Sequence, residues 1–282
     1  MARSREPLVL KFGGELLDDP ARLSTTVAAV ARIAASGTPL VVVHGGGKEI
    51  DAALRTAGIE KRQVDGLRVT DEATLGVVVS VLAGDVNTRF VAALTTAGVE
   101  AVGLTGADAG CGRSDVAPFH EAADRRHVDL GRVGVPSERA DMRLLATLME
   151  RRFVPVIACI GLASDGRLLN VNADTLAGHL AARLGARRLV IAGTTPGVLD
   201  AEGETIAMVD PEGIARLVNN GTATAGMIAK LRACEHALLA GVEDVVIVDG
   251  RDGDALASAA GSSVPTTATR LAAGVPQTNA GN

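Results

Sequence analysis

Two lysines and one aspartate are the residues of this sequence whose charges could act together on a phosphoryl group. Lys11 stands at the end of a predicted first strand, Lys230 lies in the last long predicted helix, and Asp174 begins another predicted helix. A phosphoryl group in transfer spreads negative charge over its oxygens and is stabilised by positioning and electrostatics. A lysine pair bridged by one carboxylate would provide both. Considered singly, Lys230 could be a solvated helix lysine and Asp174 an ordinary helix cap.

Two glycine turns are predicted beside these residues. An apolar strand over 40–43 runs through His44 into three glycines, 45–47, and then into a helix, while the first strand ends at glycines 13 and 14. Glycine lets backbone N–H groups approach an anion closely, and a helix N-terminus favours negative charge. The turns therefore predict a phosphate site, or else a tight strand-to-helix turn with nothing bound. The Walker pattern needs glycine at position 42, where this chain has Val42, and the dinucleotide-binding pattern needs glycine at position 50, where it has Ile50. Neither standard nucleotide fingerprint therefore fits.

Arg68 and His44 are polar residues in apolar surroundings. Arg68 lies between Leu67 and Val69, where an arginine usually binds a carboxylate of the protein or of a ligand. His44 could act as a general base, but we interpret it as a structural residue that holds the turn by hydrogen bonds. An acceptor carboxylate, with a solution pKa of about 4.3, is already ionised and needs no base. The other histidines show no metal-ligand spacing, so no metal-binding residues are predicted.

The composition excludes several classes of protein. The chain has 282 residues, 47% of them hydrophobic but only 1% aromatic, and a formal net charge of -5, which disfavours a nucleic-acid-binding surface. Its three cysteines are far apart, as expected for reduced thiols. The sequence reading finds no apolar run of the length of a membrane span and no signal core in residues 1–7. We therefore expect a cytoplasmic protein that binds small molecules and neither nucleic acid nor membrane.

Strands and helices alternate along the chain. Apolar strands are predicted at 8–12, 40–43, 101–104, 153–158, 188–192 and 244–249. Because they are apolar throughout, we expect an α/β protein with a mostly parallel sheet covered on both faces, and ligands at the carboxyl ends of the strands. Residues 105–136 are predicted to be an insertion that covers a site, and residues 263–282 a flexible tail after a single domain, 1–262.

Five ordered motifs together resemble the amino acid kinase family. They are Lys11-Phe-Gly-Gly14, His44-Gly-Gly-Gly47, Gly66-Leu-Arg-Val-Thr70, Asn170-Val-Asn-Ala-Asp174 and Gly226-Met-Ile-Ala-Lys230, within about residues 7–250. The resemblance implies a three-layer α/β/α sandwich. It also implies transfer of the γ-phosphoryl group of ATP, with Mg²⁺ held mainly by the phosphates, to a side-chain carboxylate in arginine biosynthesis. The branch of the family that phosphorylates N-acetyl-L-glutamate is the one it most resembles.

The resemblance also implies roles for individual residues. Lys11 and Lys230 would stabilise the transferring group, and Asp174 would orient them. Residues implied to bind the substrate are Gly46, Gly47, Arg68, Asn170 and Asn172. Backbone N–H donors to phosphate would be Gly13, Gly14 and Gly45. ATP would bind along Thr194, Thr195, Gly197, Gly226 and Met227, in a half of the domain from about 186 to 262, and the acyl amino acid and the dimer contacts would belong to the half from about 1 to 185.

Alternatives remain at this stage. Thr194 stands in a turn where the family usually has an aspartate, so a catalytically weakened regulator that binds nucleotide or amino acid is one alternative. Another is a sister kinase that acts on N-succinylglutamate or on carrier-linked aminoadipate or glutamate. Only seven residues precede Leu8, whereas arginine-inhibited members carry an N-terminal helix there. We therefore expect a homodimer without arginine feedback.

Overall fold

A computed structural model describes residues 6–121, 125–219, 225–261 and 263–272. One large sheet runs through it, with neighbouring strands parallel except for one antiparallel pair, β15 and β16. In spatial order its strands are β14 (Met208–Val209), β16 (Thr269–Ala272), β15 (Asp244–Asp249), β13 (Arg188–Gly193), β1 (Leu8–Phe12), β2 (Leu40–His44), β10 (Val154–Ala158) and β5 (Ala101–Thr105). The mostly parallel sheet predicted from the apolar strands is confirmed.

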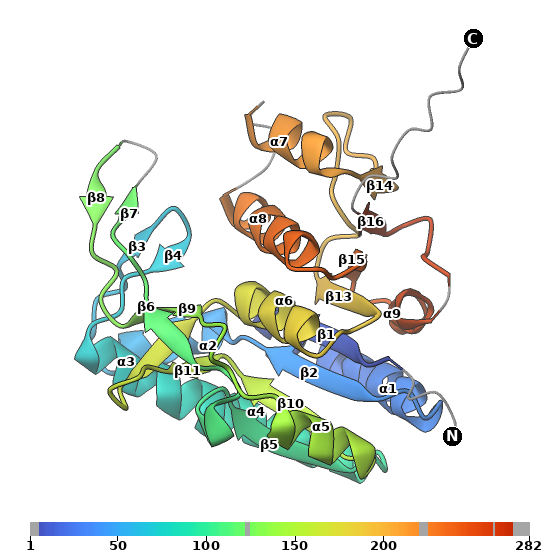
Figure 1. The fold of residues 1–282 in the computed structure, drawn as a ribbon, viewed down its shortest axis with the longest axis horizontal. Coiled ribbons are helices and arrows are strands. Elements are labelled where there is room, and N and C mark those ends of the chain that lie inside the picture. The colour runs from blue at the N-terminus through green and yellow to red at the C-terminus, as the bar shows by residue number, and fades with distance from the viewer. Residues whose placement is uncertain (1–5, 122–124, 220–224, 262, 273–282) are drawn as a thin grey trace.

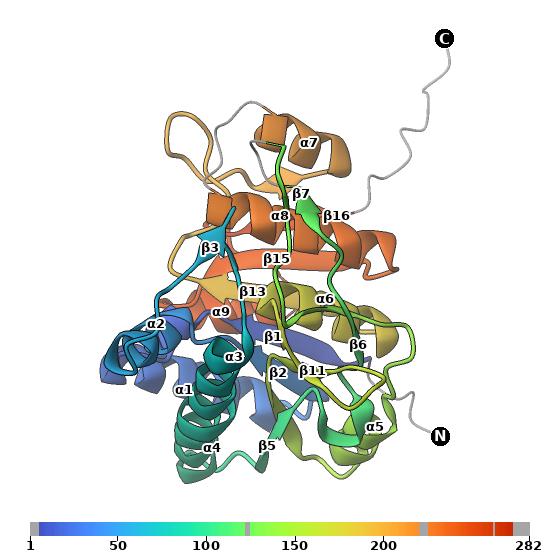
Figure 2. The ribbon, with the colours of Figure 1, turned by 90° about the vertical axis from the view of Figure 1, so that its left-hand side faces the viewer.

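Helices cover both faces of this sheet, which gives three layers (Figures 1 and 2). One face carries α5 (Arg143–Glu150), α6 (Ala173–Arg183) and α8 (Ala225–Leu239). The other carries α1 (Pro20–Ala35), α4 (Asn87–Thr96) and α9 (Gly253–Ala260). Two further helices are α2 (Gly47–Thr56), which follows β2, and α7 (Pro211–Asn219), which packs on α8. The predicted α/β/α sandwich is confirmed.

The core lies between these layers and is aliphatic. Every residue of β1, β2 and β10 is buried. Among the residues that the structure describes, aromatic packing is limited to an edge-to-face contact of Phe12 with Phe90, whose ring centroids are 5.9 Å apart, and a similar contact of Phe90 with His44. All three cysteines are buried and free. The sheet is therefore held by strands that are buried on both faces, as parallel sheets usually are.

The predicted insertion 105–136 contributes two strands to a smaller sheet and contains a hairpin. The second sheet has the order β11 (Ile160–Leu162), β12 (Leu168–Val171), β9 (Val133–Pro136) and β6 (Ser114–Val116). Two hairpins, β3–β4 (Gln63–Val64 and Leu67–Arg68) and β7–β8 (His120–Glu121 and His127–Val128), stand out from the body in Figure 1. His120 Nε2 lies 2.8 Å from Asp65 Oδ2, which joins these two hairpins.

A continuous helix over Glu72–Thr96 differs from the sequence expectation. It comprises α3 (Glu72–Val79), a π-helical segment Ser80–Val86 and α4. Its most apolar 18-residue window has a mean hydropathy of 1.5, with 33% of that window buried, so by length and composition alone it could span a membrane. The sequence reading found no such stretch because Asp85 and Arg89 interrupt the apolar residues.

The predicted tail begins too early. Residues after 262 include β16, which lies between β14 and β15 and buries Ala268, Thr269 and Leu271. This segment forms a strand because its backbone pairs with β15, and such pairing demands little of its side chains. Its composition of small residues therefore gave no strand signal. Residues 273–282 of the predicted tail lie outside the described part of the chain.

Candidate functional site

The two glycine turns meet at the carboxyl ends of neighbouring strands. β1 and β2 pair in parallel with Phe12 opposite His44, so the residues that follow each strand come out side by side. A Cβ placed on Gly14 would lie only 2.6 Å from Gly46 Cα. Any side chain at Gly14 would therefore push the two turns apart, which explains the glycine there.

Not all of the predicted N–H donors face outward. Gly13 N–H donates to Ala192 O at 3.1 Å and Gly45 N–H to Phe12 O at 3.2 Å, so both extend the sheet. The N–H groups of Gly14, Gly46 and Gly47 have no backbone acceptor within the described residues. Because Gly47 is the first residue of α2, its N–H also lies at the positive end of that helix. These three groups are the available anion donors.

Lys11 and Asp174 form a buried ion pair beside the turns. Lys11 Nζ lies 2.8 Å from Asp174 Oδ1, and the side chains are 10% and 13% exposed. Asp174 is in the first turn of α6, and this turn begins where the Asn172 side chain accepts the N–H of Thr175. The structure thus gives Asn172 a capping contact that fixes the position of Asp174.

Lys230 comes from α8, which packs closely on α6. A Cβ on Gly178 of α6 would lie 3.1 Å from Ala237 Cβ of α8, so small residues let the helices approach. Lys230 Nζ reaches the carboxyl end of β13, where it is 3.2 Å from the Cβ position of Gly193. Since β13 is the neighbour of β1, both lysines and Asp174 share one end of the sheet, as predicted.

The two lysines differ in electrostatic surroundings. Burial acts to lower the pKa of Lys11, but the charge and hydrogen bond of Asp174 and the charge of Glu15 outweigh it and raise this pKa above 10.5. The pKa of Lys230 is lowered from 10.5, by burial and then by the charge of Lys11, against opposing contributions from Asp174 and Glu15. Lys230 is therefore the easier of the two lysines to deprotonate.

Arg68 is buried at the side of the second glycine turn. Its Nη2 donates to Asp51 Oδ1, and its side chain is 9% exposed. Asp51 also binds Lys61 at 2.6 Å. Arg68 Nη1 is buried and has no hydrogen-bond partner, so the guanidinium keeps a free donor for a further carboxylate. The sequence predicted a carboxylate partner for Arg68 but did not identify Asp51, which is one of several charged residues on α2.

Asn170 is held at the end of β12 by the segment that contains Arg68. Its Nδ2 donates to Thr70 Oγ1 at 3.1 Å, and Thr70 Oγ1 donates to Arg68 O at 3.0 Å. This chain of hydrogen bonds connects two of the motifs identified in the sequence. It leaves the Asn170 carbonyl oxygen available as an acceptor.

His44 has the geometry of a structural residue. It is fully buried, its Nε2 accepts from Asn87 Nδ2 at 2.9 Å, and its Nδ1 donates to Gly45 O at 3.2 Å. Asn87 Nδ2 also donates to Val156 O, which connects β2, β10 and the helix that follows the π-helical segment. Burial lowers the pKa of His44 to about 4, so the imidazole is neutral at physiological pH. The hydrogen bonds agree with the interpretation that His44 holds the turn.

The residues predicted to bind ATP lie near the lysines in two groups. Thr194, Thr195 and Gly197 follow β13, and Thr195 Oγ1 is buried without a hydrogen-bond partner. A Cβ on Gly197 would lie 2.5 Å from Thr269 Oγ1, so close packing on β16 requires glycine there. Gly226 and Met227 belong to the first turn of α8, one helical turn before Lys230.

Glu15 is a polar residue of this region that the sequence analysis missed. It lies in the short turn Gly14–Leu16, and a Cβ on Gly13 would be 2.3 Å from both of its carboxylate oxygens. Its charge contributes to the raised pKa of Lys11 and opposes the lowering of the pKa of Lys230. A glutamate after two glycines has no sequence signature of its own, because its position depends on how the turn folds back.

Comparison with known proteins finds relatives that match most of the chain. The sequence profile described as the amino acid kinase family matches residues 6–249. A protein named acetylglutamate kinase from Novosphingobium aromaticivorans is 42% identical over 252 residues, which are 86% of this chain and 83% of the relative. A second with this name, from Caulobacter vibrioides, is 42% identical over 259 residues, 88% of this chain and 84% of the relative. The crystal structure of smu.665 from Streptococcus mutans superposes with a TM-score of 0.77 at 25% identity and covers 95% of this chain and 98% of that one.

Glycine turns at the carboxyl ends of neighbouring parallel strands, with lysines converging on them, define an α/β phosphotransferase. The chain belongs to the amino acid kinase family. The resemblance stated from the five motifs is therefore confirmed.

Proposed function

We propose that this chain transfers the γ-phosphoryl group of ATP to the side-chain carboxylate of N-acetyl-L-glutamate and forms an acyl phosphate in arginine biosynthesis. The observation that carries the proposal is the convergence of Lys11, Asp174 and Lys230 beside two touching glycine turns. The names and the 42% identity of the relatives from two organisms support the substrate.

The lysines and the free N–H groups would perform most of the catalysis. The acceptor carboxylate is ionised at neutral pH, so it attacks the γ-phosphorus directly and no proton has to be removed. The obstacle is the mutual repulsion of two anions. Lys11 and Lys230 reduce it, and Asp174 keeps Lys11 in place, while Gly14, Gly46 and Gly47 offer N–H donors to oxygens that gain charge in the transition state. His44 takes no part as a base, because it is buried and hydrogen-bonded through both ring nitrogens.

Arg68 and Asn170 would bind the remainder of the acyl amino acid. The unpartnered Nη1 of Arg68 suits the α-carboxylate of the substrate, since a hydrogen bond from a guanidinium to a carboxylate is charge-assisted and strong. Asn170 is tied to the same segment through Thr70 and offers an acceptor to the amide N–H. Asn172, Gly46 and Gly47 would complete this side of the site.

The nucleotide would bind at the C-terminal half of the domain, from about residue 186 to 262. Thr194, Thr195 and Gly197 follow β13, and Gly226 and Met227 lie in the first turn of α8, the helix that carries Lys230, so the nucleotide would bind between these two segments. The unpartnered Thr195 Oγ1 supports a polar ligand there. No cluster of three or more metal-ligating side chains occurs in the described residues, so Mg²⁺ would be held mainly by the ATP phosphates, whose charge it offsets.

A homodimer is the assembly that the surface favours. The helix Glu72–Thr96 is apolar, yet 33% of its most apolar window is buried. Its exposed positions include Ala73, Gly76, Ser80 and Gly84, all small, and the neighbouring edge strand β5 is only partly buried. Small side chains let a second helix approach closely, so a second copy of the chain would cover this face. We infer a cytoplasmic enzyme, in which this face is covered by protein and not by lipid.

The proposed activity is tested by trapping the product with hydroxylamine. Purified protein is supplied with ATP, Mg²⁺ and, in parallel, N-acetylglutamate, N-succinylglutamate or glutamate, and the hydroxamate formed from the acyl phosphate is measured. The proposal expects strong preference for N-acetylglutamate. Preference for N-succinylglutamate would favour the sister kinase, and absence of hydroxamate with all three would refute the assignment and favour a regulatory role.

A further inference from the structure

Glu15 has a carboxylate in the middle of the proposed phosphate site that the mechanism above leaves without a role. The carboxylate folds back over the first glycine turn, 2.3 Å from the Cβ position of Gly13. Its Oε1 is also 3.5 Å from the Cβ position of Gly193, the same glycine that faces Lys230 Nζ at 3.2 Å. Glu15 and Lys230 therefore border one small space between the ends of β1 and β13.

The backbone around Glu15 is fixed. Glu15 O accepts a hydrogen bond from Arg22 Nη1 at 2.8 Å, and Arg22 also pairs with Asp18 at 3.5 Å. The turn is further closed by the hydrogen bond from Leu17 N–H to Gly14 O at 2.8 Å. The carboxylate is thus held near the site by a defined turn that connects β1 to α1.

A carboxylate in this position creates an electrostatic conflict with ATP. Lys11 and Lys230 bring two positive charges, which Asp174 and Glu15 balance, so the four side chains together are neutral. The γ-phosphate would approach a glutamate as well as two lysines. Like charges that are brought close together in a partly buried site repel strongly unless a cation lies between them. MgATP brings such a cation.

Other nearby carboxylates are less suited to that cation. Asp174 Oδ1 is already bound to Lys11. Glu49 lies beside the two glycine turns, with Oε2 3.1 Å from the Cβ position of Gly14, but its Oε1 faces Arg89 Nη2 at 3.7 Å. Glu15 borders the same space as Lys230, since both face the Cβ position of Gly193. Mg²⁺ in kinase sites typically takes one or two protein carboxylates together with substrate phosphates and waters.

We propose that the Glu15 carboxylate is a protein ligand for the Mg²⁺ of MgATP. This inference rests on the proposed nucleotide site. Without metal, Glu15 would repel the phosphates of ATP, whereas with metal both would bind the same Mg²⁺. The nucleotide would therefore bind well only as MgATP. Glu15 would then discriminate MgATP from free ATP and orient the β- and γ-phosphates toward the lysines.

The test compares nucleotide binding with and without metal. Titration calorimetry measures the dissociation constant of a non-hydrolysable ATP analogue in Mg²⁺ and in EDTA, for the wild-type chain and Glu15→Gln. In the wild type, metal strengthens binding. In Glu15→Gln the analogue binds more tightly without metal, and the strengthening by Mg²⁺ falls at least about tenfold, a loss typical of removing even a group that supports a metal ligand. Asp18→Asn, which removes a carboxylate from the same turn, serves as the control and keeps the wild-type ratio.

An unchanged ratio of the two dissociation constants in Glu15→Gln would overturn the proposal. If metal-free binding also became tighter while the ratio stayed unchanged, Glu15 would only repel the nucleotide electrostatically and would not bind the metal. Glu15→Asp, which keeps the charge on a shorter side chain, gives a second variant if Glu15→Gln does not fold, and its ratio should also fall. Mn²⁺ electron paramagnetic resonance of the nucleotide complex provides a direct reading of the metal, which should bind more weakly in both variants. Failure of the wild type to bind the analogue under any condition would instead refute the proposed nucleotide site.

Discussion

Lys230 is the residue whose charge is most easily lost as pH rises. Its pKa is lowered by burial and by Lys11, whereas the pKa of Lys11 is raised by Asp174. Because the protonated form of Lys230 is the one that stabilises the transferring group, activity should be retained below its pKa and lost as pH rises through it. The alkaline limb of the pH profile then belongs to Lys230, and Lys11 follows at higher pH.

Lys230→Arg tests this assignment. The guanidinium keeps its charge to a much higher pH, so the alkaline limb of kcat should move upward, while kcat itself falls because a planar fork replaces a compact ammonium. Lys48→Arg, a similar change at a lysine that is 67% exposed on α2, is the matched control and should leave the profile unchanged. An unmoved limb in Lys230→Arg would assign that limb to another group.

Arg68→Lys tests substrate binding at the same scale. A lysine keeps one charge but loses the paired donors, so the KM for N-acetylglutamate should rise about 10- to 100-fold, as expected when a hydrogen bond to a charged group is lost. The KM for ATP should change little. Initial-rate kinetics over both substrates provide the measurement, with Arg62→Lys, an exposed partner of Asp71, as the control. Equal changes in both KM values would contradict a role specific to the acyl amino acid.

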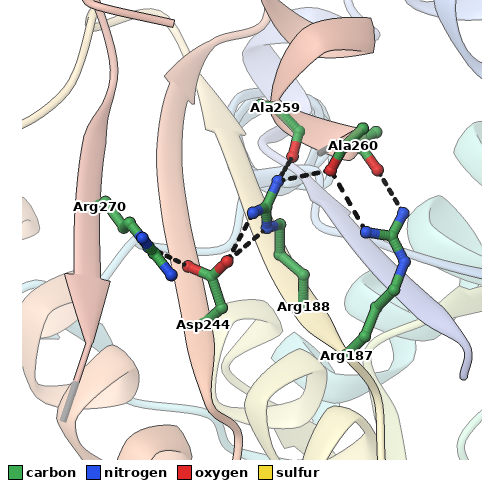
Figure 3. Close-up of polar contacts among 7 residues, drawn as sticks. Arg187, Arg188, Asp244, Ala259, Ala260 and Arg270 are labelled. Carbon is green, nitrogen blue, oxygen red and sulfur yellow. Dashed lines mark hydrogen bonds and ion pairs between the residues drawn. The ribbon is translucent and has the colours of Figure 1, made fainter. Parts of the chain in front are cut away.

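At the scale of elements, a buried charge cluster joins α9 to the amino ends of β13 and β15. Figure 3 shows Arg188 between Asp244 and the carbonyl oxygens at the end of α9. Arg188 Nη1 donates to Ala259 O at 2.6 Å and to Gly261 O at 2.8 Å, while Nε and Nη2 bind Asp244. Arg270 of β16 donates to the other oxygen of Asp244 at 2.9 Å. This cluster lies at the opposite end of the strands from the proposed site.

Asp244→Ala should therefore destabilise the fold without changing the chemistry. The Arg188 and Asp244 side chains are 7% and 9% exposed, and removing one partner of a buried pair typically costs about 3–5 kcal/mol. Urea denaturation provides the free energy of unfolding, and kcat per folded molecule should stay near the wild-type value. Asp254→Ala, which removes an 89% exposed partner of Arg32, should change stability by less than about 1 kcal/mol. A similar small loss for Asp244→Ala would show that the cluster contributes little.

The strands and the principal site residues could be predicted because their signals are local. Apolar runs such as Leu40–His44 mark buried parallel strands, and parallel strands bring the residues at their ends together, which predicted the meeting of Lys11 with the glycine turns. Glu15, Asp51 and the strand Thr269–Ala272 were missed because their roles depend on neighbours that are distant in the sequence. The π-helical segment 80–86 was not predicted either; its Leu82 lies 2.8 Å from the Cβ position of Gly46, which is distant in the sequence.

At the scale of the whole molecule, the helix Glu72–Thr96 presents an apolar face of small residues. Gly76 is exposed, and a Cβ placed there would meet no atom within 4 Å, so a larger side chain is compatible with the monomer. Gly76→Arg should therefore leave the chain folded but prevent a second copy from approaching this face. Light scattering after size-exclusion chromatography should report a dimer for the wild type and a monomer for Gly76→Arg.

The exposed Ala28 of α1 offers the matched control, and Ala28→Arg should remain dimeric. A monomeric wild-type protein, or a dimeric Gly76→Arg variant, would show that this helix is not the contact between copies. Because this helix and the lysine site are on different parts of the fold, the Gly76→Arg variant would also show whether catalysis requires the dimer.

The central claim, that the lysine pair stabilises the transferring phosphoryl group, is tested most directly by Lys230→Ala. We expect kcat for acyl-phosphate formation to fall by at least about 10²- to 10³-fold, the loss typical of one preorganised electrostatic group, while the dissociation constant of a non-hydrolysable MgATP analogue rises only a few-fold. Both quantities are measured on the same folded preparation. A variant that keeps its turnover, or loses only nucleotide affinity, would contradict the account and identify Lys230 as a binding residue alone.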